Sequence, residues 1–198
     1  YGKTVWSEGF GLADREQQVT VNPASTRFRI ASISKALTAT AMAVLYERGQ
    51  LKPDSSVWHY LKDFPAKPYR PTVRQVAGHL GGIRHYRGNE NESNVRYPDV
   101  RSGLNIFKDD TLLCKPGTQY NYSSYGYNLL SAVMESAAGR NFLELMQSEI
   151  FIPMGMANTI ADHTDSVITG RGRYYLRNGR NAPAVDNSYK WAGGGFLS

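Results

Sequence analysis

The chain has 198 residues, of which 41% are hydrophobic and 20% charged; 23 Lys and Arg against 17 Asp and Glu give a net charge of +6. This composition excludes a disordered or fibrous protein, and the length predicts one domain with a sizeable core. The single cysteine, Cys114, excludes an intrachain disulfide, and no apolar run approaches the roughly 18 residues that a membrane-spanning helix needs.

The first 48 residues predict strands followed by one long helix. Residues 3–6 and 10–13 are short strand-like segments broken by glycines, and residues 26–30 alternate polar and apolar side chains. Residues 33–48 contain neither Gly nor Pro and stop before Gly49, which predicts a helix with a glycine at its end. Because its apolar residues surround most of the helix, we predict that this helix is buried on most sides.

The middle of the chain predicts a short helix followed by a long loop. Thr72 and Gln75 have the spacing of a capping box, so a helix is expected from there to about His79. Residues 81–103 are rich in Asn, Arg, Gly and Tyr and are predicted to be irregular.

The C-terminal third returns from helix to strand. Residues 127–138 place apolar side chains on one face and end before Gly139, and a further helix is expected over residues 141–151. Residues 173–176, with Asn178-Gly179 directly after them, predict a strand that turns into a hairpin.

Ser32 and Lys35 form the first candidate for chemistry, where a predicted strand gives way to a helix. Side chains three residues apart lie on one face of a helix, so the hydroxyl and the amine can meet while Ser34 points elsewhere. A serine hydroxyl becomes a good nucleophile only when a nearby base takes its proton. The alternative is a capping Ser32 beside a Lys35 that reaches the solvent, and a chance Ser-x-x-Lys is expected about once in a chain of this length.

A tyrosine-rich stretch, residues 115–127, forms the second candidate. Its Pro-Gly turn leads through a loop into the predicted helix at residue 127. Four tyrosines within eight residues are equally consistent with packing groups that have polar tips.

Together these motifs resemble one family, the class C β-lactamases, D-alanyl-D-alanine peptidases and related esterases. The resemblance rests on four stretches in the family's order and spacing, residues 28–35, 76–83, 116–127 and 191–195. Residues 82–86 and 186–191 are most similar to the mitochondrial serine β-lactamase-like proteins and their bacterial serine-hydrolase relatives.

The resemblance implies a fold and a set of roles. The expected fold is of the α/β (α+β) class, an antiparallel sheet flanked by helices as in β-lactamases and DD-peptidases, with residues 1–198 as a single domain. Ser32 would be the nucleophile that carries the acyl group, and Tyr122 with Lys35 would accept and return its proton. The backbone N–H of Ser32 would form half of an oxyanion hole.

Two departures from the family pattern shape these expectations. Ser124 occupies the position of the family's asparagine; we expect it to contribute to substrate binding, but with a shorter side chain that puts amide recognition in doubt. No Lys-Thr-Gly or His-x-Gly triad follows Tyr122. We therefore expect a domain truncated at both ends and incomplete at its C-terminus.

The remaining candidates favour structural roles. His79 resembles the histidine of a family turn near the site, and a structural role is favoured for it. The other histidines show no metal-ligand spacing with one another or with Cys114, so we expect no metal and no cofactor. Glycines 193–195 favour close backbone packing over phosphate binding.

The sequence thus predicts a serine hydrolase of the peptidase, esterase or β-lactamase type, acting on a small-molecule or peptide substrate. A catalytically inactive binding or scaffolding protein with the same fold is the alternative. A nucleic-acid binder is disfavoured because the basic residues are scattered. The location is expected to be exported or periplasmic in a bacterium, or else mitochondrial, and the oligomeric state stays open.

Overall fold

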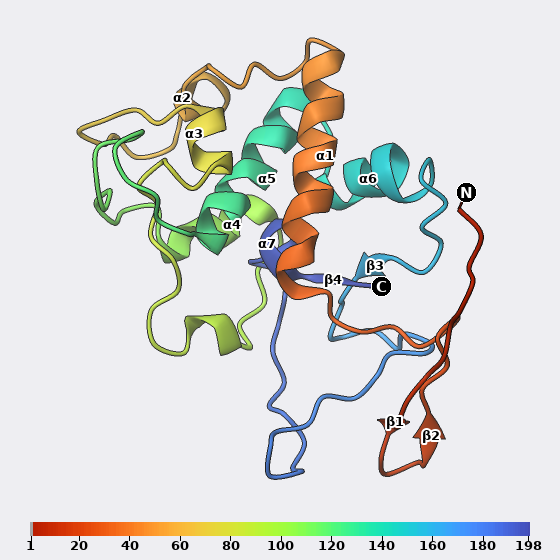
Figure 1. The fold of residues 1–198 in the computed structure, drawn as a ribbon. Helices are drawn as coiled ribbons and strands as arrows, with labels where there is room; N and C mark the ends of the chain where they lie inside the picture. The colour runs from red at the N-terminus through yellow and green to blue at the C-terminus, as the bar shows by residue number, and fades with distance from the viewer. Residues whose placement is uncertain (1) are drawn as a thin grey trace.

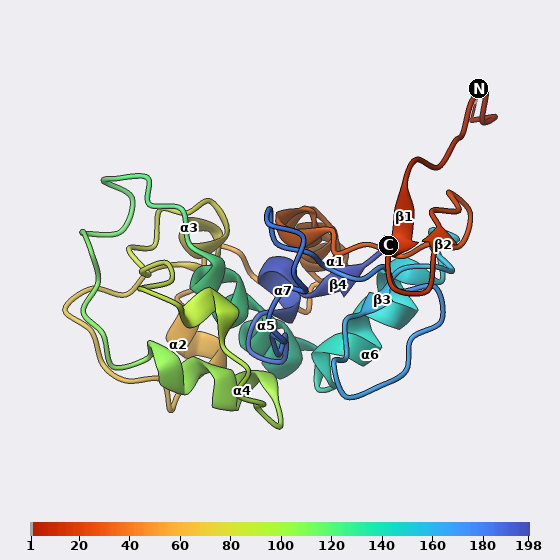
Figure 2. The same ribbon diagram turned by 90° about the horizontal axis from the view of Figure 1, so that it is seen from below.

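A computed structural model describes residues 2–198, and three helices from distant parts of the chain form its centre (Figure 1). Helix α1 (Ser34–Glu47) packs against α5 (Ser124–Ala138) and against the short α7 (Trp191–Gly194). Seen from below, the three lie together between a helical side, with α2 to α4, and a side that carries the strands (Figure 2). This junction positions the candidate site.

Helix α1 confirms the predicted helix almost to the residue. A 3₁₀ turn over Ala31–Ile33 precedes it, and Gly49 follows with a left-handed φ of 71°. The prediction that the helix is buried on most sides is wrong. Because its partners α5, α6 and α7 leave one side uncovered, only one stripe is buried, and the alanines at 36 and 43 are exposed.

Helix α5 is the most buried element. Its predicted start at residue 127 is three residues late, because the Ser123 hydroxyl accepts a hydrogen bond from the Gly126 N–H and caps the helix earlier. Every residue from Ser124 to Met134 is buried. The helix ends as predicted at Gly139, which adopts the left-handed conformation that favours glycine.

The helical side consists of short segments. Helix α3 (Val73–Ala77) confirms the predicted capping box, since Thr72 Oγ1 accepts from the Gln75 N–H and Gln75 Oε1 accepts from the Thr72 N–H. The prediction that residues 81–103 are irregular is correct up to residue 99, apart from a 3₁₀ turn over Glu90–Glu92. It is wrong for the last four residues, which form a helix. Sequence patterns missed the four-residue helices α2 (Val57–Tyr60) and α4 (Val100–Gly103), and a 3₁₀ turn (Leu104–Ile106) follows α4.

The other side holds short antiparallel pairs. Strand β1 (Leu12–Asp14) pairs with β2 (Val19–Thr20), and β3 (Ile160–Ala161) pairs with β4 (Phe196–Leu197). Helix α6 (Phe142–Met146) continues into a π-helical turn (Gln147–Phe151), which together cover the predicted helix of residues 141–151.

The predicted strands are only partly confirmed. Residues 26–30 run beside β4, where Phe28 and Ser198 exchange backbone hydrogen bonds, so they pair as a strand does. Residues 3–6 form no strand and, within the described part of the chain, make no backbone hydrogen bonds to a neighbouring strand. At residues 173–182 the turn forms at Gly179, but only one bridge, Tyr175 to Asn181, links its arms.

One apolar core joins the two sides. It runs from Leu45 of α1 through Leu129 and Val133 of α5 to Phe142 of α6 and Phe196 of β4. Within residues 2–198, none of the helices has both the length and the apolar character required to cross a bilayer.

Candidate active site

Ser32 and Lys35 meet as their spacing predicts. Lys35 Nζ lies 3.1 Å from Ser32 Oγ, and the amine is buried while the hydroxyl is exposed. Ala31, directly before Ser32, has a left-handed φ of 45°, a conformation that costs a non-glycine residue about 1–2 kcal/mol. The nucleophile candidate therefore stands on a tight turn at the start of α1.

Tyr122 completes the group from the loop that leads into α5. Its phenolic oxygen lies 2.6 Å from Ser32 Oγ, and the centre of its ring is 4.9 Å from Lys35 Nζ. The loop thus brings a side chain 90 residues away in sequence into hydrogen-bond contact with the hydroxyl. The structure places the three predicted catalytic residues together.

Lys35 is held by three further groups. Its Nζ donates to the carbonyl oxygen of Gly193 at 2.5 Å and to Ser124 Oγ at 3.0 Å, and it lies 5.6 Å from the centre of the Tyr127 ring. The snorkelling alternative, in which Lys35 reaches solvent, is therefore wrong, because only 6% of the residue is exposed. Sequence reasoning missed the role of the Gly193 carbonyl, which residue type does not reveal.

Burial and contact shift the acid–base properties of this pair. Burial lowers the pKa of Lys35 below its usual value of 10.5, although the neighbouring Tyr122 opposes that shift. Burial alone would raise the pKa of Tyr122, but its contacts with Lys35 and Ser32 outweigh this effect and bring the pKa below 10.0. Both shifts increase the fraction of uncharged amine and of phenolate at neutral pH, and either of these forms can accept a proton.

Ser124 lies beneath the group rather than at its surface. The residue is 4% exposed, and its hydroxyl accepts from Lys35. The half-buried Tyr86 lies beside it; burial raises the pKa of Tyr86 to about 12, so this phenol stays protonated at neutral pH. A direct role for Ser124 in substrate binding stays a prediction.

Two of the three glycines at 193–195 confirm the close packing predicted for them, whereas Gly194 has only ordinary contacts, the nearest at 3.6 Å. A Cβ on Gly193 would lie 3.1 Å from the Ser124 carbonyl oxygen, and one on Gly195 would lie 2.7 Å from the Trp191 side chain. The absent side chain at 193 lets α7 approach α5 closely enough for its carbonyl to reach Lys35.

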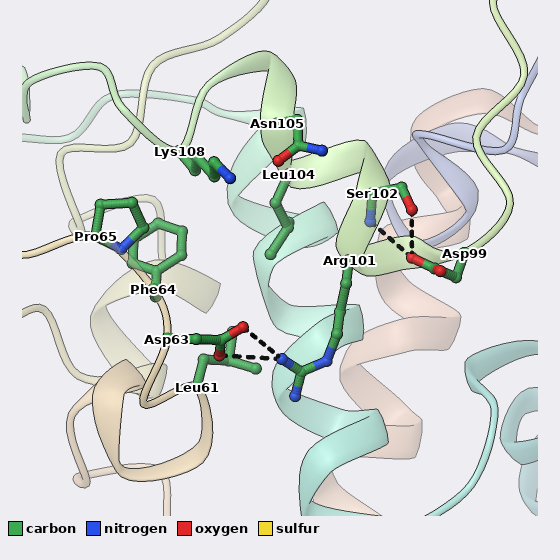
Figure 3. A pocket seen from close by; sticks show the side chains of 10 residues that line it. All are labelled: Leu61, Asp63, Phe64, Pro65, Asp99, Arg101, Ser102, Leu104, Asn105 and Lys108. Carbon is green, nitrogen blue, oxygen red and sulfur yellow. Dashed lines mark hydrogen bonds and ion pairs between the residues drawn. The ribbon is translucent and has the colours of Figure 1, made fainter.

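A separate hollow of about 300 Å³ lies between the segment after α2 and helix α4 (Figure 3). The side chains of Leu61, Phe64 and Leu104 form its apolar wall. Arg101, which also lines the hollow, makes a salt bridge to Asp63 at 3.1 Å. Ser32, Lys35 and Tyr122 do not line this hollow, so it lies apart from the candidate site. The described part of the chain also holds no group of three or more His, Cys, Asp or Glu that could bind a metal.

Comparison with known proteins places this chain in a family. The model of the family described as Beta-lactamase matches residues 1–198. The chain belongs to the beta-lactamase family. It is 36% identical over 270 residues to the mitochondrial serine beta-lactamase-like protein LACTB of Homo sapiens, covering all of this chain and 49% of that protein. It is 29% identical over 202 residues to a D-aminopeptidase of Gluconobacter oxydans, covering 97% of this chain and 37% of that protein.

Solved structures of beta-lactamase relatives confirm the predicted fold class. The octameric penicillin-binding protein homologue of Pyrococcus abyssi superimposes with a TM-score of 0.83 at 25% identity, over 100% of this chain and 47% of that chain. The chain spans about half the length of the curated relatives it matches. The serine β-lactamase and penicillin-binding-protein resemblance predicted from the sequence is confirmed.

Proposed function

We propose that the full-length protein containing this chain is a serine hydrolase that forms an acyl-enzyme on Ser32. The observation that carries the proposal is the 2.6 Å contact between Ser32 Oγ and the Tyr122 phenol, with Lys35 Nζ 3.1 Å from the same hydroxyl. Membership of a family that includes a D-aminopeptidase supports hydrolysis of an acyl bond. The substrate is proposed to be a peptide, an amide or an ester.

The proposed acylation moves one proton and one acyl group. The Ser32 proton passes to the Tyr122 oxygen, which Lys35 keeps deprotonated for part of the time, and the serine oxygen bonds to the substrate carbonyl carbon. When the tetrahedral intermediate collapses, the bond to the leaving group breaks and that group takes the proton from Tyr122. Water then attacks the ester carbonyl carbon and gives one proton to the Tyr122 oxygen. The bond from that carbon to the Ser32 oxygen breaks, the serine oxygen takes the proton back from Tyr122, and the acid is released.

The positive end of α1 and the backbone N–H of Ser32 are proposed to stabilise the oxyanion. Charge develops on the substrate oxygen in the transition state, and a backbone donor fixed beforehand stabilises it without reorganisation. The second donor of the family's oxyanion hole comes from a late strand and is not assigned to a residue of this chain.

Labelling of the nucleophile tests the proposal. The full-length protein is treated with a fluorophosphonate probe and the modified peptide is identified by mass spectrometry. We expect labelling at Ser32 in the wild type and none in Ser32→Ala. Equal labelling of both proteins would overturn the assignment of the nucleophile and favour a non-catalytic binding protein with this fold.

A matched pair of tyrosine variants tests the proton acceptor. Tyr122→Phe is expected to slow acylation about 10²- to 10⁴-fold, the usual contribution of a positioned acid–base group. Tyr120→Phe, on the same loop and 63% exposed, is expected to acylate at the wild-type rate. The same slowing in both variants would indicate damage to the loop instead of loss of a proton acceptor.

Location is proposed from the relatives alone. The name of the human relative assigns that protein to mitochondria, which supports the mitochondrial alternative for this chain over export. Immunofluorescence or fractionation of the source cells with an antibody to the full-length protein decides between them.

A further inference from the structure

Two histidines hold the backbone directly after Tyr122. The Ser123 N–H donates to His79 Nδ1 at 3.1 Å, and the next N–H along the chain, that of Ser124, donates to His85 Nδ1 at 3.2 Å. A ring nitrogen accepts a hydrogen bond only when it carries no proton. We infer that His79 and His85 are positioning residues for Tyr122, and that each does this only as the neutral imidazole with its proton on Nε2.

The two rings also contact the tyrosine side chain itself. The centre of the Tyr122 ring is 4.6 Å from that of His79 and 5.3 Å from that of His85. The phenol ring is therefore in contact with both imidazoles while its oxygen contacts Ser32. These two contacts restrict the torsions that would swing the phenol away from the hydroxyl.

His79 fixes the loop through its backbone as well. Its left-handed φ of 61° is unusual for a residue other than glycine, and its carbonyl oxygen accepts from the Asn121 N–H at 2.8 Å. The Ser123 hydroxyl adds a 2.6 Å hydrogen bond to the Arg84 carbonyl oxygen. The backbone is thus held at residue 121, directly before Tyr122, and at residues 123 and 124, directly after it.

The charges around the two imidazoles favour the neutral form. Lys35 from α1 faces both histidines, and phenols pack against them: Tyr120, Tyr122 and Tyr127 beside His79, and Tyr86 and Tyr122 beside His85. The Arg84 guanidinium donates to the His85 carbonyl oxygen at 3.0 Å and is paired with Glu90 and Asp110. Burial and the positive charge of Lys35 lower the pKa of both histidines below 6.5, with His85 adding to the effect on His79.

Protonation of either ring removes the acceptor and adds positive charge beside Lys35. A hydrogen bond to Ser123 or Ser124 then breaks, and the loop that carries Tyr122 is released. Misplacement of a catalytic group by about 1 Å costs up to about a hundredfold in rate. The kinetic part of this inference rests on the proposed acylation of Ser32, whereas the tautomer and the hydrogen bonds do not.

The decisive experiment reads the tautomers directly. In ¹⁵N-labelled full-length protein, long-range ¹H–¹⁵N spectra of the imidazoles are recorded between pH 8 and pH 5. At pH 7 we expect both Nδ1 atoms to resonate as bare nitrogens and both Nε2 atoms as protonated ones. A protonated Nδ1 on either residue at pH 7 overturns the inference whether or not the protein is an enzyme.

Matched variants test the consequence for acylation. The asparagine Oδ1 offers an acceptor near the position of Nδ1 and does not titrate, whereas leucine offers none. His79→Leu and His85→Leu are expected to lower the acylation rate constant about ten- to a hundredfold without changing KM. His79→Asn and His85→Asn are expected to recover most of that loss. The double asparagine variant is expected to lack the additional fall in rate below pH 6.5 that protonation of the two histidines is expected to add, in the wild type, to the decline set by Lys35 and Tyr122.

His59→Leu, at an exposed histidine of α2, serves as the control and is expected to leave the rate unchanged. Leucine variants that acylate at the wild-type rate overturn the inference. If the leucine variants do not fold, the asparagine variants and the wild-type spectra still decide. If the wild type shows both bare Nδ1 atoms but no acylation, the proposed function fails and the positioning of the loop stands.

Discussion

Lys35 donates a 2.5 Å hydrogen bond from its buried amine to the carbonyl oxygen of Gly193, 158 residues later in the chain. The contact links the helix that carries the nucleophile candidate to α7, which packs on α5. A buried ammonium without hydrogen-bond partners is costly, so this carbonyl helps to keep the amine in place beside Ser32. The position of α7 therefore influences the acid–base group directly.

Gly193→Ala tests this link. The new methyl would lie 3.1 Å from the Ser124 carbonyl oxygen and would push α7 away from α5. We expect a loss of about 1–3 kcal/mol in the free energy of unfolding, measured by urea denaturation, together with slower labelling of Ser32. Gly194→Ala, whose methyl meets its nearest atom at an ordinary 3.6 Å, is the control. Equal effects at both positions would argue against the link.

The pH dependence of acylation follows from the Lys35 and Tyr122 shifts. Because both pKa values are lowered, the deprotonated forms appear below pH 10, and the rate is expected to rise to a plateau before that pH. The apparent pKa belongs to the pair. Tyr122 raises the pKa of Lys35, so the residual rate of Tyr122→Phe is expected to rise at lower pH than that of the wild type. Stopped-flow measurements between pH 5 and pH 10 give the pH–rate profiles of acylation for the wild type and for Tyr122→Phe. An unchanged profile in the variant would contradict the effect of Tyr122 on the pKa of Lys35.

Asp162 anchors the strand side. Its carboxylate is fully buried and accepts from Arg29 at 2.5 Å, from Arg171 at 3.1 Å and from Asn187 at 2.8 Å. Asp162→Asn removes the charge that balances two arginines. Because both arginine side chains are 26% exposed, the expected loss in the free energy of unfolding is about 2–4 kcal/mol, at the lower end for a buried pair. Asp165→Asn, which breaks an exposed pair with Arg96, is expected to change it little. Thermal and urea unfolding of the Asp162→Asn and Asp165→Asn variants measure the two losses in stability.

Arg84 organises the long loop after α3. Its guanidinium, 5% exposed, contacts the carboxylates of Glu90 and Asp110, and Arg84→Met leaves both without this partner. Because the two carboxylates are partly exposed, the expected loss is about 2–4 kcal/mol, at the lower end for a buried pair. Arg74→Met, at the exposed pair with Asp54, is the control.

The same network predicts sensitivity to acid. Burial alone would raise the pKa of Glu90, but its hydrogen bonds with Arg84 outweigh this and lower it, and those with Arg84 also lower the pKa of Asp110. Carboxyl groups with lowered pKa values contribute stability above their unfolded values of about 4, and that stability is lost as pH falls through the folded values. Between pH 5 and pH 2 the wild type is therefore expected to lose more stability than Arg84→Met. A parallel decline of the two proteins would contradict this.

Local patterns predicted the elements that local interactions determine. The helix over residues 33–48 and the capping box at Thr72 depend on propensity and on contacts three or four residues apart, and both are confirmed. Helices α2 and α4 escaped prediction because four residues carry almost no periodic signal. The burial of α1 was overestimated because composition cannot tell which face receives a partner.

The same distinction between local and long-range contacts applies to the candidate site. The spacing of Ser32 and Lys35 predicted their meeting, whereas Tyr122 was assigned by family resemblance. His85 and the Gly193 carbonyl act through bonds between side chain and backbone across 39 and 158 residues, and no local pattern encodes those distances. The tyrosine-rich loop and the glycine run gave the only signals that the sequence offered for these contacts.

Assembly of the reactive group from Ser32, Tyr122 and Gly193 has a consequence during protein synthesis. A ribosome that adds about 5–20 residues per second needs roughly ten to thirty seconds to pass from the first of these positions to the last. During that interval the group is incomplete: Lys35 follows Ser32 at once, Tyr122 comes 90 residues after Ser32, and the Gly193 carbonyl that holds the Lys35 amine comes last. Acyl transfer is therefore expected to begin only after chain growth has passed α7, which protects the emerging polypeptide from premature modification.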